Sequence, residues 1–279
     1  MTAAAPVTGS SGESAAERPG AQPADVLVKM TGVGKRFDNG VVALQDLDLA
    51  VGRHEFVSLL GPSGCGKSTA LRLIAGLGAP TSGVIEWTDP AHARSRTDIG
   101  FVFQEPTLMP WATVFDNVLL PLKLQRRSDA GSEVVDALAM VGLTGFEKAY
   151  PRELSGGMKM RVSIARALVT RPRVLLMDEP FAALDEITRF RLNNDLLQLW
   201  RSQAWTVVFV THSVYESVYL SNRIMVMAAR PGRIVDEHRV DTPDRLVVRD
   251  DEFRTSPYYN ECCRIVSHSL AQAMRAGGG

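Results

Sequence analysis

One stretch decides the fold of this chain: Gly61-Pro62-Ser63-Gly64-Cys65-Gly66-Lys67-Ser68, which follows the apolar run Phe56 to Leu60 and precedes the helix-like stretch Leu71 to Ile74. A glycine-rich loop between a strand and a helix turns successive backbone N–H groups toward an anion, and the helix start adds the positive end of its dipole. In such a loop Lys67 reaches the terminal phosphates and Ser68 holds magnesium. The stretch therefore predicts a site for a nucleoside triphosphate with Mg2+, and the alternative is an ordinary glycine-rich turn.

Strand-like segments precede this phosphate loop, and strands alternate with helices after it. Strands are expected at 26–28, 41–44, 47–49, 83–87, 99–103, 174–177, 206–210 and 224–227. Helical periodicity is expected over 113–150, within a helical subdomain at about 105–160, and in helices at 156–169, 188–200 and 258–274. Because strand and helix alternate, the sequence predicts an α/β fold with a mostly parallel sheet.

The composition limits which classes of partner and which cellular compartment are expected. Lys plus Arg and Asp plus Glu each number 31, so the net charge gives no reason to expect a nucleic-acid partner. The three cysteines are too few and too poorly spaced for a disulfide framework or a zinc site, which favours a reducing, cytoplasmic setting. No apolar segment approaches the length of a membrane-spanning helix. Residues 1–25 are rich in Ala, Ser, Gly and Pro and are expected to form a disordered tail without a signal peptide.

A pair of carboxylates follows the buried strand expected at 174–177. Asp178, at the end of a strand beside the phosphate loop, could hold magnesium through water. Glu179 could polarise the attacking water, the step that separates a nucleotide binder from a hydrolase. The alternative is a pair of solvated acids in a turn.

A second anion-accepting helix start lies at Leu154-Ser155-Gly156-Gly157-Met158, called the signature segment below. It combines flexible backbone with a hydroxyl group ahead of a long helix. One chain therefore carries two phosphate cradles. If both cradles grip one triphosphate, the second can come from another subunit, and a two-fold dimer then contains two equivalent sites.

At this point the chain resembles the ATP-binding subunit of ATP-binding cassette transporters, over roughly Val26 to Arg233. The resemblance implies a P-loop NTPase core at 26–235, with an antiparallel β subdomain and a helical subdomain, and a C-terminal extension at 236–279 that ends in a helix. It also implies that Gln104 contacts magnesium and the attacking water, and that His212 acts as a switch near the γ-phosphate. Asp185 would belong to a loop that crosses the dimer interface. Alone, Gln104 or His212 would be interpreted as a surface or capping residue.

The resemblance further implies an ATPase that works as a homodimer, with ATP between the phosphate loop of one copy and the signature segment of the other. Phe37 would stack against adenine, and a packed core phenylalanine is the alternative. The implied catalytic residues are Glu179, His212 and Gln104, and the implied magnesium-binding residues are Ser68, Gln104 and Asp178. The implied ATP-binding residues are Phe37, Gly61, Pro62, Ser63, Gly64, Cys65, Gly66, Lys67, Ser68, Thr69, Ser155, Gly156, Gly157 and Asp185.

Residues 104–111 and 113–118 are similar to the nitrate, sulfonate and taurine importer subfamily, where this segment faces a helix of the membrane subunit. Met109-Pro110-Trp111 would form a socket for that helix, or would pack in the core. The implied partners are a second copy, a membrane permease and, through the permease, a substrate-binding protein. The implied location is the cytoplasmic face of the cell membrane. One departure is Met158, where many members have glutamine.

Other classes share part of this pattern. A small-molecule kinase would carry the phosphate loop but has no use for the signature segment. A soluble cassette ATPase of DNA repair or translation shares all the motifs, although repair versions insert coiled coils between the cradles and translation versions carry two cassettes. An efflux half-transporter would carry fused membrane helices. The sequence does not identify the transported substrate.

Overall fold

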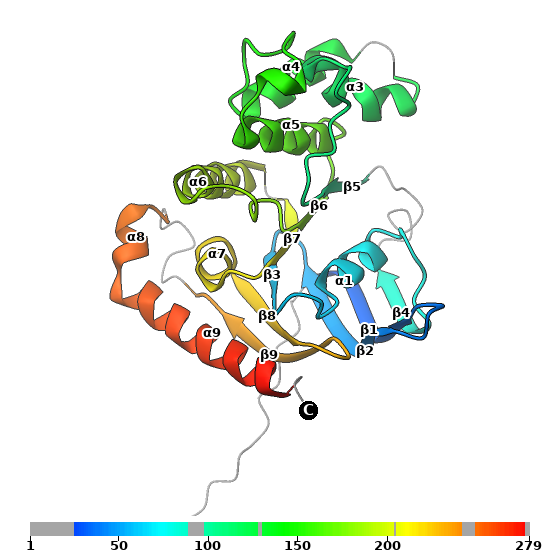
Figure 1. Cartoon of the computed structure of the whole chain (residues 1–279), viewed down its shortest axis with the longest axis vertical. Coiled ribbons are helices and arrows are strands. Elements are labelled where there is room, and N and C mark those ends of the chain that lie inside the picture. The colour runs from blue at the N-terminus through cyan, green and yellow to red at the C-terminus, as the bar shows by residue number, and fades with distance from the viewer. Residues whose placement is uncertain (1–24, 89–97, 128–129, 204, 242–248, 277–279) are drawn as a thin grey trace, which may run out of the picture.

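A six-stranded sheet forms the centre of the molecule, with the strand order β5-β6-β7-β3-β8-β9 (Figure 1). The structure, a computed structural model, describes residues 25–88, 98–127, 130–203, 205–241 and 249–276, so the tail expected at 1–25 lies outside it except for Asp25. Five strands are parallel and β9 is an antiparallel edge strand, which confirms the predicted mostly parallel sheet. The strands are β3 (Phe56–Leu60), β5 (Ile99–Val102), β6 (Val174–Asp178), β7 (Thr206–Thr211), β8 (Arg223–Ala228) and β9 (Arg233–Arg239).

The central strands are buried on both faces, as their nearly continuous apolar sequences require. Successive side chains of one strand point to opposite faces. In β3, Phe56 and Leu60 therefore join one hydrophobic core, and Val57 and Leu59 join the other. The sheet thus separates two cores.

A helix and a small antiparallel sheet cover one face, and three other helices lie against the opposite face (Figure 1). The small sheet has the order β2-β1-β4. Its strands are β1 (Val26–Arg36), β2 (Val42–Gly52) and β4 (Ser82–Trp87), and the helix on this face is α1 (Lys67–Ile74). The helices on the opposite face are α6 (Glu186–Gln203), α7 (Val214–Leu220) and α9 (Pro257–Ala276).

Three helices form a group at one end of the molecule, within and beyond the range 105–160 where a helical subdomain is expected (Figure 1). They are α3 (Val114–Leu124), α4 (Gly131–Met140) and α5 (Gly156–Leu168), with a short 3-10 turn, η2 (Pro151–Glu153), before α5. The side chain of Thr113 caps α3 by accepting a hydrogen bond from the Asp116 N–H. No helix in the described ranges is both long and apolar enough to cross a bilayer.

Some elements differ from those expected from the sequence. The segments 41–44 and 47–49 belong to one strand, β2, because Asp46 adopts a left-handed φ of 47° that lets pairing with β1 continue past it. The edge strand β9 was not predicted, because its sequence is charged and lacks an apolar run. Helix α7 was also missed, because its seven residues are too few to show a clear period.

The C-terminal extension is fixed to the core by a buried arginine. Arg249 is 8% exposed and donates hydrogen bonds to the carbonyl oxygens of Val218, Tyr219 and Ser221 at 3.3, 2.8 and 2.9 Å. These carbonyls belong to the C-terminal turn of α7, where a cation is favoured by the helix dipole. The short helix α8 (Asp251–Thr255) and α9 follow directly.

The Arg249→Met variant is expected to lower the free energy of unfolding by about 2–4 kcal/mol, because the end of α7 would lose three charged hydrogen bonds inside the protein. Denaturant unfolding followed by circular dichroism measures this loss. Arg264→Met serves as the control, because Arg264 is exposed on α9, where it pairs with Glu261. Equal stability of both variants would contradict the anchoring role.

Candidate active site

The phosphate loop lies between β3 and α1, at the carboxyl end of the parallel strands. Gly64 and Gly66 have φ values of 76° and 91°, which glycine adopts without steric cost. Gly66 is the N-cap of α1 and supplies no side-chain hydrogen bond, so the first N–H groups of α1 are left for a ligand. A Cβ atom on Gly66 would lie 2.7 Å from the Ala43 carbonyl oxygen. The loop therefore has the open backbone geometry of an anion cradle.

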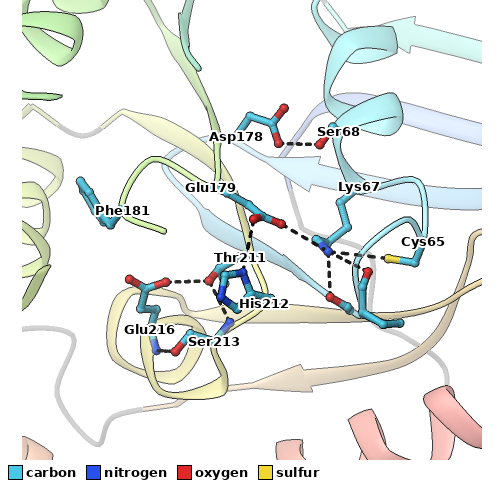
Figure 2. A network of polar contacts seen from close by, with 12 residues as sticks. Cys65, Lys67, Ser68, Asp178, Glu179, Phe181, Thr211, His212, Ser213 and Glu216 are labelled. Atoms are coloured by element: carbon cyan, nitrogen blue, oxygen red, sulfur yellow. Dashed lines mark hydrogen bonds and ion pairs between the residues drawn. The ribbon is translucent and has the colours of Figure 1, made fainter. Parts of the chain in front are cut away.

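Lys67 places its ammonium group inside this loop (Figure 2). Its Nζ atom donates to the carbonyl oxygens of Gly61 and Pro62 at 2.7 and 3.0 Å, and it lies 3.6 Å from Glu179 Oε1. The residue is only 4% exposed. A buried cation so close to the backbone cradle adds charge where phosphate oxygens would lie.

Cys65 lies beneath the loop rather than on its open side. It is 1% exposed, and burial raises the pKa of its thiol. The Lys67 charge, which lowers that pKa, offsets the effect only in part. The side chain therefore packs as a small apolar group and not as a nucleophile.

A hydroxyl and a carboxylate meet beside the loop. Ser68 Oγ donates to Asp178 Oδ1 at 2.7 Å, and Asp178 ends β6. Burial raises the pKa of the Asp178 carboxyl, while the hydrogen bond from Ser68 and the charge of Arg72 oppose that rise. Oxygen donors of this kind are the ligands that Mg2+ prefers. The donor set thus fits magnesium.

Gln104 lies at the same edge of the sheet. It comes two residues after β5, whose Val102 is paired with Met177 in β6, so it follows the strand next to Asp178. Its side chain is exposed. This position allows a contact with a ligand held at Ser68 and Asp178.

Glu179 and His212 face each other at the ends of adjacent strands (Figure 2). His212 Nδ1 lies 3.3 Å from Glu179 Oε2. Glu179 has a φ of 46°, and its N–H donates to the Val210 carbonyl at 3.0 Å. A left-handed conformation in a residue other than glycine is held by its surroundings, and such strained residues cluster at active sites and ligand clamps. The carboxylate of Glu179 is placed between Lys67 and His212.

The signature segment begins α5 and packs against the start of α6. Ser155 accepts a hydrogen bond from the Met158 N–H at 3.3 Å, and both Ser155 and Gly156 are exposed. A Cβ atom on Gly157 would lie 2.7 Å from Thr188 Cγ2, so only glycine allows this approach. Because α5 belongs to the core on one face of the sheet and α1 to the core on the other, the two cradles do not lie together within one chain.

Asp185 caps α6 next to the signature segment. Its Oδ1 atom accepts from the Thr188 N–H at 2.9 Å, and this hydrogen bond is the main reason why the pKa of the Asp185 carboxyl is lowered. The side chain is exposed. Thr188 therefore contacts both the Asp185 loop and the signature segment.

Two aromatic side chains singled out in the sequence are exposed. Phe37 is 44% exposed in the turn between β1 and β2, with Lys35 Nζ 5.7 Å from its ring centre, so the alternative of a packed core residue is wrong. Trp111 is 76% exposed, which excludes core packing for that residue, whereas Met109 is half-buried. Arg166 of α5 holds the preceding loop through the carbonyl oxygens of Pro106 and Thr107, at 2.8 and 2.9 Å.

Gly232 packs against the backbone of the phosphate loop, and sequence reasoning did not single out this residue. Its N–H donates to the Ala43 carbonyl, and its own carbonyl accepts from the Gln45 N–H, at 3.1 and 3.0 Å. A Cβ atom on Gly232 would lie 2.1 Å from the Cys65 carbonyl oxygen. No side chain fits here, because the contact is with backbone.

The Gly232→Ala variant is therefore expected to bind ATP about 10-fold more weakly, because the added methyl group displaces the phosphate loop. Titration with a fluorescent ATP analogue measures the affinity. Gly78→Ala is the matched control, since a Cβ atom there meets only the end of the Leu73 side chain at 3.7 Å. Unchanged affinity in Gly232→Ala would contradict the supporting role.

Comparisons with known proteins agree with this geometry. Residues 44–182 match the family described as ABC transporter. The aliphatic sulfonates import ATP-binding protein SsuB of Bacillus cereus is 44% identical over 212 residues, which cover 75% of this chain and 84% of the relative. The nitrate import ATP-binding protein NrtD of Synechocystis sp. is 47% identical over 216 residues, which cover 76% and 79%.

Solved structures show the same architecture. A dimeric structure of the bacterial ABC transporter cassette MJ0796 has a TM-score of 0.67 and 34% identity, over 77% of this chain and all of that chain. A dimeric post-hydrolysis state of that cassette, bound to ADP and Pi, has a TM-score of 0.66 at the same identity and coverage.

Proposed function

Because the chain belongs to the ABC transporter family as its ATP-hydrolysing subunit, we propose that it powers the uptake of a small anion or organic solute through a separate membrane permease. The printed functions of two relatives, import of aliphatic sulfonates and of nitrate, support a cargo of this kind. These names do not support the alternative of a soluble cassette ATPase in DNA repair or translation. The permease would hold the chain at the cytoplasmic face of the membrane, and a substrate-binding protein would deliver the cargo.

The observation that carries the mechanism is the separation of the two cradles within one chain. The phosphate loop leads into α1, which packs on one face of the sheet, and the signature segment starts α5, which packs on the other. In the proposed site the phosphate loop of one copy holds the phosphates, and Ser155 to Gly157 of a second copy closes over them. ATP binding then draws two copies together, and hydrolysis separates them.

Each residue of the cradle has a proposed role. The backbone from Gly61 to Gly66 and the N–H groups of Lys67 to Thr69 bind the phosphate oxygens, while Phe37 stacks against adenine. Ser68, Asp178 and Gln104 would hold Mg2+, which, when bound, neutralises charge that develops on the β- and γ-phosphates.

Hydrolysis needs a group that takes a proton from water. Glu179 is proposed as that general base, because its carboxylate lies at the mouth of the loop between Lys67 and His212. His212 holds the carboxylate and contacts the γ-phosphate, and Asp185 reaches toward the second copy. The chain itself thereby supplies a base, an orienting group and the phosphate cradle.

The segment around Trp111 is the proposed contact for the permease. An exposed tryptophan beside half-buried apolar residues is typical of a socket for a partner helix. Arg166 connects this segment to α5, whose first residues form the signature segment. A movement of the permease helix could thus reach the ATP site through one rigid helix.

Uptake in cells of the source organism tests this proposal. Removal of the chain should abolish uptake of one class of anion among nitrate, alkanesulfonates and taurine, and the unaltered chain should restore it. Glu179→Gln should not restore it. Unchanged uptake of every such anion, together with copurification of a nucleic-acid-bound partner instead of a membrane protein, would overturn the proposal.

A further inference from the structure

A buried glutamate ties the end of strand β7 to helix α7. Glu216 is 8% exposed, and its Oε2 atom accepts a hydrogen bond from Thr211 Oγ1 at 2.6 Å (Figure 2). Thr211 Oγ1 in turn accepts from the Ser213 N–H at 3.0 Å. These two hydrogen bonds hold Thr211 and Ser213, the residues on either side of His212. The Glu216 carboxylate therefore fixes the turn that carries His212.

An arginine holds the neighbouring turn from Glu179 to Asp185 in a similar way. Arg189, in the first turns of α6, donates from Nη2 to the Leu184 carbonyl at 2.8 Å and from Nε to the Phe181 carbonyl at 3.3 Å. Leu184 directly precedes Asp185, and Phe181 follows Glu179 by two residues. One guanidinium group thus holds the middle and the end of this turn.

The two side chains meet in a partly buried ion pair. Arg189 Nε lies 3.8 Å from Glu216 Oε1, with side-chain exposures of 30% and 10%. Burial raises the pKa of the Glu216 carboxyl, and the hydrogen bond from Thr211 and the Arg189 charge act against that rise. Because a buried charge that loses its partner is costly, the position of each side chain depends on the other.

We propose that Glu216 and Arg189 are positioning residues that keep His212 correctly placed relative to the turn from Glu179 to Asp185. This inference rests on the proposed function, in which Glu179 and His212 act on one γ-phosphate and Asp185 reaches the second copy. Among the described residues, no hydrogen bond joins Glu216 or Arg189 to the phosphate loop. The pair therefore affects the alignment of the reacting groups and not the binding of ATP.

Kinetics of four variants test the inference: Glu216→Gln, Arg189→Gln, the double variant of these two, and Arg189→Lys. Each single variant should lower kcat for ATP hydrolysis about 10-fold and leave KM within about twofold, since only alignment is lost. The double variant should be no slower than the slower single variant, because two residues that act as one unit do not give additive losses. Arg189→Lys, which keeps the charge but not the two-pronged donor geometry, should also lower kcat.

Glu55→Gln is the matched control. Glu55 forms another partly buried ion pair, with its Oε2 atom 2.7 Å from Arg223 Nη1 and side-chain exposures of 16% and 5%. It lies at the amino end of β3, the opposite end of the sheet from His212. The Glu55→Gln variant should lower the melting temperature by an amount similar to Glu216→Gln, while its kcat for ATP hydrolysis stays unchanged.

Three results would overturn the inference: an unchanged kcat in Glu216→Gln or in Arg189→Lys, equal losses of kcat in Glu216→Gln and Glu55→Gln, or additive losses in the double variant. If Glu216→Gln does not fold, Arg189→Gln and Arg189→Lys decide the question. If the unaltered chain does not hydrolyse ATP, the proposed function fails, which is distinct from failure of this pair.

Discussion

Replacement of Lys67 by alanine is expected to weaken ATP binding by about 100-fold, which corresponds to about 3 kcal/mol. The ammonium group is almost fully buried within the loop and contacts two of its carbonyl oxygens. Without it, the Glu179 carboxylate, now 3.6 Å from Nζ, would face the phosphate charge directly. Calorimetric titration with ATP and magnesium measures the affinity.

Lys123→Ala is the control for this loss of charge. Lys123 lies on the exposed side of α3, where it pairs with Asp116 at 3.2 Å, far from the loop in the sequence and in the fold. It should bind ATP as the unaltered chain does. Equal affinity in Lys67→Ala and Lys123→Ala would refute the assignment of residues 61–68 as the phosphate cradle.

The Glu179→Gln variant is expected to keep its affinity for ATP while kcat falls about 1000-fold, the size of effect that loss of a general base produces. Glutamine has the shape of glutamate and can still contact Lys67 and His212, so the site stays assembled. It cannot accept a proton from water. Single-turnover hydrolysis of radiolabelled ATP measures the chemical step without the later steps.

Glu186→Gln is the companion variant. Glu186 is exposed in the first turn of α6, seven residues from Glu179, and no described contact of Lys67 involves it. Its kcat should match that of the unaltered chain. Rapid turnover by Glu179→Gln would exclude the general-base role and leave His212 as the group to test.

The parts of this molecule that follow from local chemistry could be predicted from the sequence. Gly61 to Ser68 between an apolar strand and a helix specified the loop, and fully apolar runs such as 174–177 specified buried parallel strands. The fold class and the family are confirmed by the comparisons. The proposed nucleotide binding at this loop rests on backbone geometry that glycine permits and other residues do not.

The supporting residues could not be predicted, because their roles depend on contacts between segments far apart in the chain. Gly232 packs against the backbone of Cys65 and Ala43, and Glu216 contacts Arg189 and Thr211. In the sequence each is an ordinary glycine or glutamate in a polar or short segment. The exposure of Phe37 likewise depends on how β1 and β2 pair, which its neighbours alone do not determine.

The central claim is that one ATP site is built from two copies of this chain. The most direct measurement is the molar mass of Glu179→Gln in solution by light scattering, with and without ATP and magnesium. We expect the mass of one chain without ATP and twice that mass with it, while Lys67→Ala stays at the mass of one chain in both conditions. A Glu179→Gln sample that binds ATP fully and keeps the mass of one chain would contradict the claim.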